Sequence, residues 1–198
     1  MPKDPKFIKI PSRYIDRVIG NYNPVVIITT RNANGECNAA PFAMCMEVCH
    51  QPPLIAFGVG HTKDTYHNVV ASGEFVVNVP GQDILRNLMV TAIRYPPETN
   101  ELIEARLNEL PGIKINVKRI KECKLHFECV LEWTKETGNH FLVVGRVVSA
   151  TANKAVLTDD YRLKFEKIKP VHYVGRGTNT FLESGKLVTV ERKPFEPQ

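Results

Sequence analysis

The stretch VVIITTRNANGECNAAPFAM, residues 25–44, decides the fold. Its first half is a run of β-branched residues, which is typical of a buried strand. Asn34-Gly35 follows, and this pair favours a tight hairpin because both residues tolerate positive φ. The returning half, residues 37–48, is apolar but contains Pro41, which a central strand excludes. We therefore expect a hairpin whose second strand lies at a sheet edge or bends.

Downstream, strands and short helices continue to alternate. Apolar and polar residues alternate cleanly over residues 124–133, which predicts a half-buried strand with His126 and Glu128 on its solvated face. The strands expected after the hairpin lie at 54–59, 74–79, 124–133 and 140–150. Helices are expected at 63–71, 83–95 and 98–107, with Thr62 and Asp83 as N-caps of the first two. This order predicts a mostly β fold with added helices, an antiparallel Greek-key barrel whose closure removes exposed sheet edges.

Composition limits the possible classes of protein. The chain has 198 residues, of which 43% are hydrophobic and 24% charged, so we expect one globular domain over residues 1–198. No run approaches the roughly 18 apolar residues that span a membrane. The charged start, MPKDPKFIKIPS, predicts no secretory signal, so a cytoplasmic location without membrane contact is expected.

Charge and cysteine content narrow the choice further. The net charge of +5 suits an anionic small molecule and falls short of a nucleic-acid-binding signature. The dense basic run at 118–124 contains no aromatic side chain on which bases could stack, which disfavours a β-barrel that binds nucleic acid. Five cysteines without a CxxC pair predict reduced, mostly buried thiols and no disulfide framework. Two cysteine–histidine groups, near 45–50 and 126–129, lack a second half at zinc-site spacing, so no metal site is expected.

Residues 58–65, GVGHTKDT, combine a glycine-bearing turn with a helix start. Free N–H groups at a helix N-terminus, threonine hydroxyls and the Lys63 ammonium together suit a phosphate. An ordinary capped helix would have the same sequence pattern. On local evidence the segment is more typical of a structural helix start, with an anion site as the alternative.

Two further positions could contact a ligand. Asn38-Ala39-Ala40-Pro41-Phe42-Ala43 has small side chains beside a proline, which would let a flat ligand approach the backbone, and Asn38 can both donate to and accept from a heteroaromatic edge. The alternative is a bent edge strand whose small residues pack against a neighbour. His140 follows a Thr-Gly-Asn turn and so lies at a sheet end, where it could contact a ligand or simply face solvent.

Three stretches, taken in order, resemble the flavin reductase-like family of FMN-binding split-barrel proteins, which includes flavoredoxin and archaeal ferric reductase-type proteins. They are residues 25–44, residues 51–79 (QPPLIAFGVGHTKDTYHNVVASGEFVVNV) and residues 138–148 (GNHFLVVGRVV). N-x-x-P-F, P-P-L, K-D-T-x-x-N and S-G-E-F-V-V-N carry the resemblance, with a weaker echo in residues 169–172. This sequence departs from the family at Ala43-Met44-Cys45-Met46, where many relatives have serines.

The resemblance implies a six-stranded split barrel that assembles as a homodimer, with FMN near the subunit interface. It implies a domain core at about 19–150 and a C-terminal segment, 151–198, that wraps the body or the dimer partner. The turn would hold the FMN phosphate, the small-residue strand would line the isoalloxazine, His140 would approach from a neighbouring strand, and Phe181 would be a C-terminal aromatic contact. The implied FMN-binding residues are Asn38, Ala39, Ala40, Pro41, Phe42, Ala43, Thr62, Lys63, Asp64, Thr65, His140 and Phe181.

The function implied is an FMN-dependent oxidoreductase of the flavin reductase, ferric reductase or flavoredoxin type. The flavin would carry out the redox chemistry, so no catalytic triad is expected, and none is visible in the sequence. NAD(P)H is a possible electron donor, and the acceptor would be a small molecule or a protein. The alternatives are a non-catalytic FMN-binding electron carrier and an enzyme resembling pyridoxamine-phosphate oxidase, which shares the split barrel.

Overall fold

The predicted hairpin begins the sheet. The structure is a computed structural model that describes residues 10–13, 23–174, 180–183 and 185. β1 (Val26–Arg31) pairs antiparallel with β2 (Cys37–Phe42), and Gly35 in the connecting turn has a φ of +87°. The Asn32 side chain accepts hydrogen bonds from the backbone N–H groups of Asn34 and Glu36, which fixes the turn. The hairpin prediction is confirmed.

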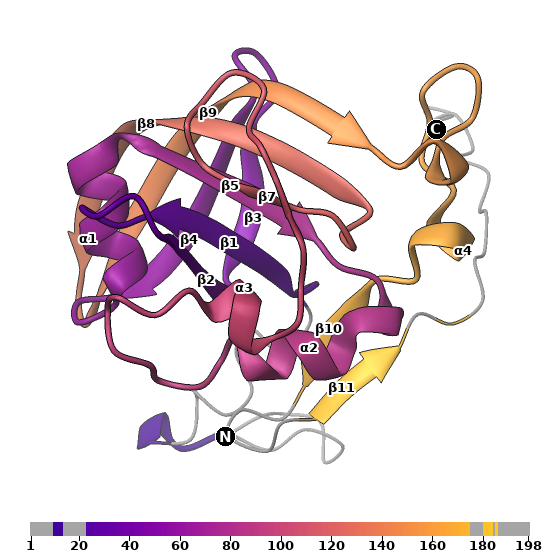
Figure 1. Ribbon diagram of the computed structural model, residues 1–198. Coiled ribbons are helices and arrows are strands. Elements are labelled where there is room, and N and C mark those ends of the chain that lie inside the picture. The colour runs from indigo at the N-terminus through magenta and orange to yellow at the C-terminus, as the bar shows by residue number, and fades with distance from the viewer. Residues whose placement is uncertain (1–9, 14–22, 175–179, 184, 186–198) are drawn as a thin grey trace.

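Seven antiparallel strands form the main sheet in the order β2-β1-β5-β8-β9-β4-β3. The strands beyond the hairpin are β3 (Cys45–Cys49), β4 (Leu54–Gly60), β5 (Glu74–Val79), β8 (Leu125–Thr137) and β9 (His140–Ala152). β2 and β3 stand at opposite ends of this order, yet only Ala43 and Met44 separate them in the chain. The segment that contains Pro41 therefore bends from one sheet edge to the other, and the sheet curls into a barrel (Figure 1). This confirms the mostly β, antiparallel barrel.

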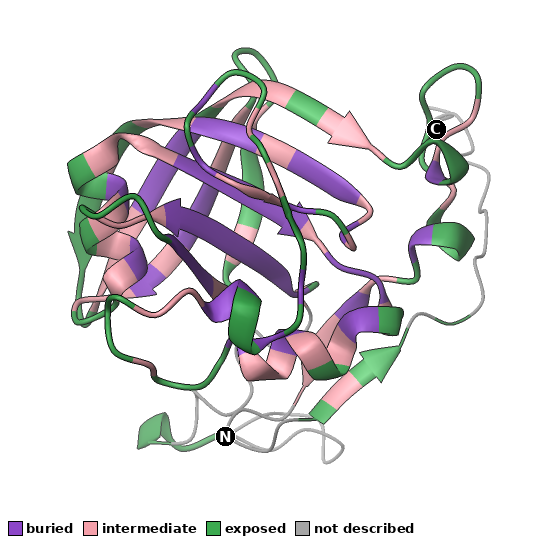
Figure 2. Cartoon of the chain, viewed as in Figure 1, coloured by how far each residue is buried: buried purple, intermediate pink, exposed green. Residues whose placement is uncertain are grey.

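Aromatic rings fill the barrel interior. Phe57 contacts both Phe42 and Phe75 edge to face, with ring centroids 5.2 Å apart in each pair. A Cβ atom at Gly145 would lie 2.4 Å from the Phe75 ring, so only glycine leaves room for this ring. Figure 2 shows the resulting layer of buried residues along the strands.

Three helical segments border β1 and β2. α1 (Asp64–Ser72) ends at Gly73 with a φ of +71°, whereas α2 (Leu85–Val90) and α3 (Glu101–Glu104) pack Leu88 and Leu102 into a second core cluster with Ile27. Figure 1 shows α1 to one side of β2, with α2 and α3 below it. The expected helices at 83–95 and 98–107 are thus much shorter than predicted.

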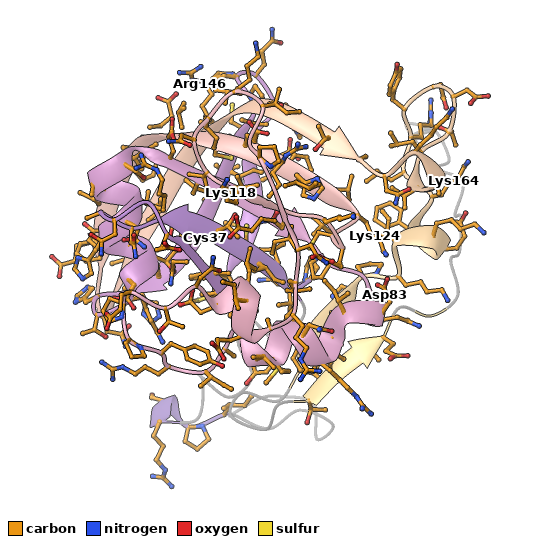
Figure 3. All side chains as sticks on the ribbon, in the orientation of Figure 1. Cys37, Asp83, Lys118, Lys124, Arg146 and Lys164 are labelled. Atoms are coloured by element: carbon orange, nitrogen blue, oxygen red, sulfur yellow. The ribbon has the colours of Figure 1, made fainter. Side chains whose placement is uncertain are left out.

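Both predicted N-caps are wrong. Lys63, not Thr62, occupies the N-cap position of α1, because the chain turns between Gly60 and Lys63 before the helix starts. Asp83 lies inside the short 3₁₀ segment η2 (Gln82–Ile84) that precedes α2. Its carboxylate instead accepts a hydrogen bond of 2.6 Å from Lys124, and both residues are labelled in Figure 3.

The strand predicted as half-buried over 124–133 is buried on both faces along its first half. Residues 111–117, between β6 (Glu109–Leu110) and β7 (Arg119–Ile120), cover the outer face of the barrel, where Ile115 and Val117 pack against Val76. His126 and Glu128, expected on a solvated face, are 6% and 1% exposed for this reason. Alternation along a strand cannot indicate that a distant loop covers its polar face.

The C-terminal elements are η3 (Lys154–Val156), α4 (Phe165–Ile168), β10 (Val171–Val174) and β11 (Thr180–Glu183). The backbone N–H of Val25 donates to the carbonyl of Val171 at 2.9 Å, so β10 lies beside the start of the hairpin. The predicted start of the core at residue 19 and the tail beyond residue 185 lie outside the described residues. Among the helices that the structure describes, none is both long and apolar enough to cross a membrane.

Candidate functional site

A cavity of about 390 Å³ lies between β2, the turn before α1 and the loop at 91–97. Residues from five stretches of the chain line it, within 38–44, 58–65 and 91–97 and at 101 and 140, so the barrel brings together positions that are far apart in sequence. The sequence-predicted residues in its wall are Asn38, Ala40, Pro41, Phe42, Thr62, Lys63, Asp64, Thr65 and His140.

Three of the predicted residues do not line this cavity. Ala39 is fully buried in the core cluster below β2. Ala43 and Phe181 line a neighbouring, smaller cavity of about 210 Å³, where Phe181 contacts Tyr173 edge to face at 5.6 Å. The two cavities share Pro41, Phe42 and Ala92 as a common wall.

The start of α1 forms the rim of the larger cavity. Lys63 has extended backbone at the N-cap position and offers no side-chain acceptor to the first turn of the helix. The first-turn N–H groups of a helix have no intrahelical partner and carry partial positive charge. With the exposed Lys63 ammonium beside them, they make this rim a suitable place for an anion.

His140 enters the cavity from the other side of the same turn. It is the first residue of β9 and pairs with Gly60, the last residue of β4, so the register itself places the histidine beside the turn. Its Nδ1 lies 2.7 Å from the side-chain oxygen of Asn139. This contact leaves Nε2 as the ring atom that can face a ligand.

At the floor of the cavity, Asn38 and Glu101 form a buried hydrogen-bonded group. The side-chain Nδ2 of Asn38 donates to Glu101 Oε1 at 2.7 Å, and the backbone N–H of Ala39 donates to Glu101 Oε2 at 3.0 Å. Asn38 Oδ1 accepts from the hydroxyls of Thr30 and Thr65 at 3.1 and 3.4 Å. Asn38 is only 3% exposed, so its side chain is held by protein groups on every polar atom.

Burial raises the pKa of Glu101 above its ordinary value, and the negative charge of Asp64 raises the same pKa further. The hydrogen bonds from Ala39 and Asn38 act in the opposite direction, because they stabilise the ionised carboxylate. The net direction is upward, so the cavity floor holds a carboxyl group that is harder to ionise than a solvated one.

Sequence reasoning missed much of the cavity wall. Residues 91–95 were predicted as the last part of a helix that Pro96-Pro97 ends, yet the helix stops at Val90, and Ile93, Arg94 and Tyr95 line the cavity from the loop that follows. The Pro-Pro pair sets a limit that the helix cannot pass, but no local pattern marks the earlier end. Glu101 was missed as well, and no local pattern marks it, because its partners lie 63 residues earlier in the chain.

Neither the cysteines nor the possible metal-binding side chains of the described residues form a disulfide or a metal site. All five cysteines are free, and burial raises the pKa of Cys45, beside the cavity, to about 12, so it stays a protonated thiol at neutral pH. Within the described ranges, no cluster of three or more histidine, cysteine, aspartate or glutamate side chains is arranged to hold a metal ion.

The family model described as a flavin reductase like domain matches residues 20–178, most of the chain. The chain belongs to the flavin reductase-like family. The resemblance carried by residues 25–44, 51–79 and 138–148 is thereby confirmed. A curated relative, an uncharacterized protein of Methanothermobacter thermautotrophicus, is 31% identical over 156 residues and covers 76% of this chain and 74% of its own.

Two solved structures superpose on nearly the whole chain. Nitrilotriacetate monooxygenase component B from Bacillus cereus has a TM-score of 0.84 at 25% identity, covering 96% of this chain and 98% of its own. Flavoredoxin of Desulfovibrio vulgaris has a TM-score of 0.79 at 18% identity, covering 96% and 97%. The second likeness shows the split-barrel fold, and family membership supports a flavin-related redox role for an enzyme of the oxidoreductase type.

Proposed function

We propose that the protein is an oxidoreductase that binds FMN in the 390 Å³ cavity and passes electrons through it. The observation that carries the proposal is the meeting, in one cavity, of the Asn38–Phe42 strand and the Thr62–Thr65 turn, the two segments that the family resemblance links to FMN. The cavity volume is within the range of small-molecule sites, roughly 300–1,000 Å³.

The residues present suit the two ends of FMN. Lys63 and the uncapped start of α1 would hold the phosphate, whose charge they complement. The ring system would lie along β2 and β4, where Ala40, Gly58 and Gly60 have little or no side chain of their own and the Met44 side chain lies against Gly58. Thr65 would support the rim indirectly, because its buried hydroxyl donates to Asn38.

FMN, when bound, supplies the ability to accept and release electrons or hydride, and the protein supplies position and electrostatics. His140 Nε2 would offer a hydrogen bond from the β9 side. Met44 and the loop at 91–97 would limit access of water to the ring. The donor in this proposal is NAD(P)H, and the acceptor is ferric iron, another flavin or a protein.

The proposal is tested by titrating the purified protein with FMN and then mixing the loaded protein with NADH or NADPH without air. Uptake of FMN followed by loss of its visible absorbance supports a reductase. Uptake followed by reduction with dithionite alone identifies an electron carrier. A protein that takes up no FMN contradicts the proposal.

We also propose that two copies of the chain associate through the outer face of β3, β4, β9 and β8. The register Met46–Ala56–Val144–Trp133 runs across these four strands on one face, and directly paired residues point to the same side of a sheet. Met46 and Trp133, at the two ends of this register, are 62% and 46% exposed, whereas Ala56 and Val144 between them are each 1% exposed, so the two outer side chains are the apolar surface that a second copy would cover. Met44 belongs both to this region and to the cavity wall, so a partner copy would lie close to the flavin.

Substitution of Met46 by Glu tests the dimer, because it puts a charge on the most exposed apolar position of the proposed interface. The wild type is expected to sediment as a dimer and Met46→Glu as a monomer, whereas a monomeric wild type contradicts the proposal. We further propose that the protein is cytoplasmic. All five cysteines are free thiols, as expected in a reducing compartment.

A further inference from the structure

Glu101 stands at the point where three elements around the cavity meet. It is the first residue of α3, only 6% exposed, and lines the cavity floor. β2 is an edge strand that pairs with β1 on one side only. On its open side, the Glu101 carboxylate accepts the hydrogen bond of the Ala39 N–H. The second carboxylate oxygen accepts from Asn38 on the same strand.

This contact determines the orientation of the Asn38 amide. Because Nδ2 donates to Glu101, Oδ1 is turned toward the two threonine hydroxyls, one on β1 and one in the first turn of α1. Thr30 in turn accepts a hydrogen bond from Asn68 of α1 at 3.1 Å. A single carboxylate therefore connects α3, β2 and the helix start that is the proposed phosphate rim.

The carboxylate also brings charge to the cavity. The charged or ionisable groups that line the cavity with it are Lys63, Asp64, Arg94, Tyr95 and His140, and within the described ranges none of them forms an ion pair with Glu101. Both partners of Glu101 are neutral N–H donors. Its negative charge is therefore not cancelled by a cation in contact with it.

We propose that Glu101 is the positioning residue of the cavity, which fixes the β2 wall through Asn38 and Ala39 and places a negative charge there that disfavours addition of electrons to a bound flavin. This rests on the proposed function. Reduction adds negative charge to the ring, so an unneutralised carboxylate in the same cavity weakens binding of reduced FMN more than that of oxidised FMN.

The test compares the affinities of the full-length protein for oxidised and reduced FMN. Glu101→Gln removes the charge and is expected to favour reduced FMN by about tenfold relative to wild type, which for a two-electron couple is a rise in midpoint potential of about 30 mV. Glu101→Asp keeps the charge and is expected to leave the ratio of affinities within about twofold, while both affinities fall. Glu104→Gln, an exposed change on the same helix, is the matched control and should change neither affinity.

An unchanged ratio in Glu101→Gln overturns the inference, since a purely structural role would weaken both redox forms equally. If this variant does not fold, Asn38→Ala tests the positioning directly: both affinities should fall by about tenfold with the ratio unchanged, and unchanged affinities overturn the inference. A wild type that binds neither form of FMN overturns the proposed function and this inference together, which distinguishes that failure from the others.

Discussion

Two buried carboxylates at different places on the barrel show how similar local chemistry can serve different purposes. Glu128 on β8, 1% exposed, accepts hydrogen bonds from the backbone N–H groups of Ile113 and Lys114, and its carboxylate lies 3.5 Å from Arg119. Glu101 also accepts a backbone N–H, but it contacts an amide side chain in place of a guanidinium and borders a cavity. The first carboxylate pairs with a guanidinium and holds a loop over the barrel, whereas the second contacts only neutral N–H donors and borders a space that a ligand can enter.

The largest effect is expected where the paired carboxylate is removed. Glu128→Ala leaves the backbone N–H groups of Ile113 and Lys114 without their acceptor and removes the ion-pair partner of Arg119, so the free energy of unfolding should fall by about 3–5 kcal/mol. Urea denaturation measures this change, with Glu104→Ala as an exposed control that should stay within about 0.5 kcal/mol. A loss below about 1 kcal/mol for Glu128→Ala would contradict the claim that Glu128 stabilises the fold by holding the 113–114 loop.

Next in size is the loss of the cation at the cavity rim. Lys63→Ala should weaken FMN binding by about 1.5–3 kcal/mol, because one charge-assisted contact to the phosphate disappears. Fluorescence titration with FMN measures the change, and Lys167→Ala, an exposed substitution on α4, is the matched control. Equal affinity of Lys63→Ala and wild type would place the phosphate elsewhere.

The raised pKa of Glu101 predicts how the stability of the protein depends on pH. Its pKa in the folded protein is raised above the ordinary value of 4.5, so the folded chain keeps this proton to a higher pH than the unfolded chain does. As pH rises above 4.5, the unfolded chain releases the proton first, and the contribution of the neutral carboxyl to stability is lost until pH passes the folded pKa. Stability of the FMN-free wild type, measured relative to Glu101→Gln by urea denaturation, should therefore fall over this window. A difference that stays constant with pH would contradict the raised pKa.

The smallest effect is expected for a carboxylate outside both sites. Glu132 pairs with Arg146 on the barrel surface at 2.5 Å, where both side chains are more than one-third exposed. Glu132→Gln should change the free energy of unfolding by less than about 1 kcal/mol, and added salt should reduce even that. A larger loss of stability would contradict the idea that only the buried carboxylates, Glu101 and Glu128, matter for the site and the fold.

The parts of the fold predicted from sequence are those that local chemistry controls. Asn34-Gly35 and Pro41 dictate the hairpin and the bend within a few residues of themselves, and the Thr62–Thr65 turn lies in the cavity wall because the strand before it and the helix after it are both locally specified. The α1 cap was misplaced by one residue, an error to which helix boundaries are prone.

The parts that could not be predicted depend on contacts between distant segments. Glu101 meets Asn38 across 63 residues, and Glu128 meets the 113–114 backbone only after a loop folds over the barrel. In sequence, each looks like an ordinary solvated acid. Asn38 was predicted to face a ligand edge, yet its amide is bonded to Glu101, Thr30 and Thr65, an arrangement that only the assembled cavity creates.

In the proposed function, the cavity between β2 and α1 holds one FMN per chain. Fluorescence titration of the purified protein with FMN tests this most directly, with wild type and Lys63→Ala measured side by side. We expect saturation at one FMN per chain for the wild type and a clearly weaker affinity for Lys63→Ala. Absence of saturable FMN binding to the wild type would contradict the claim.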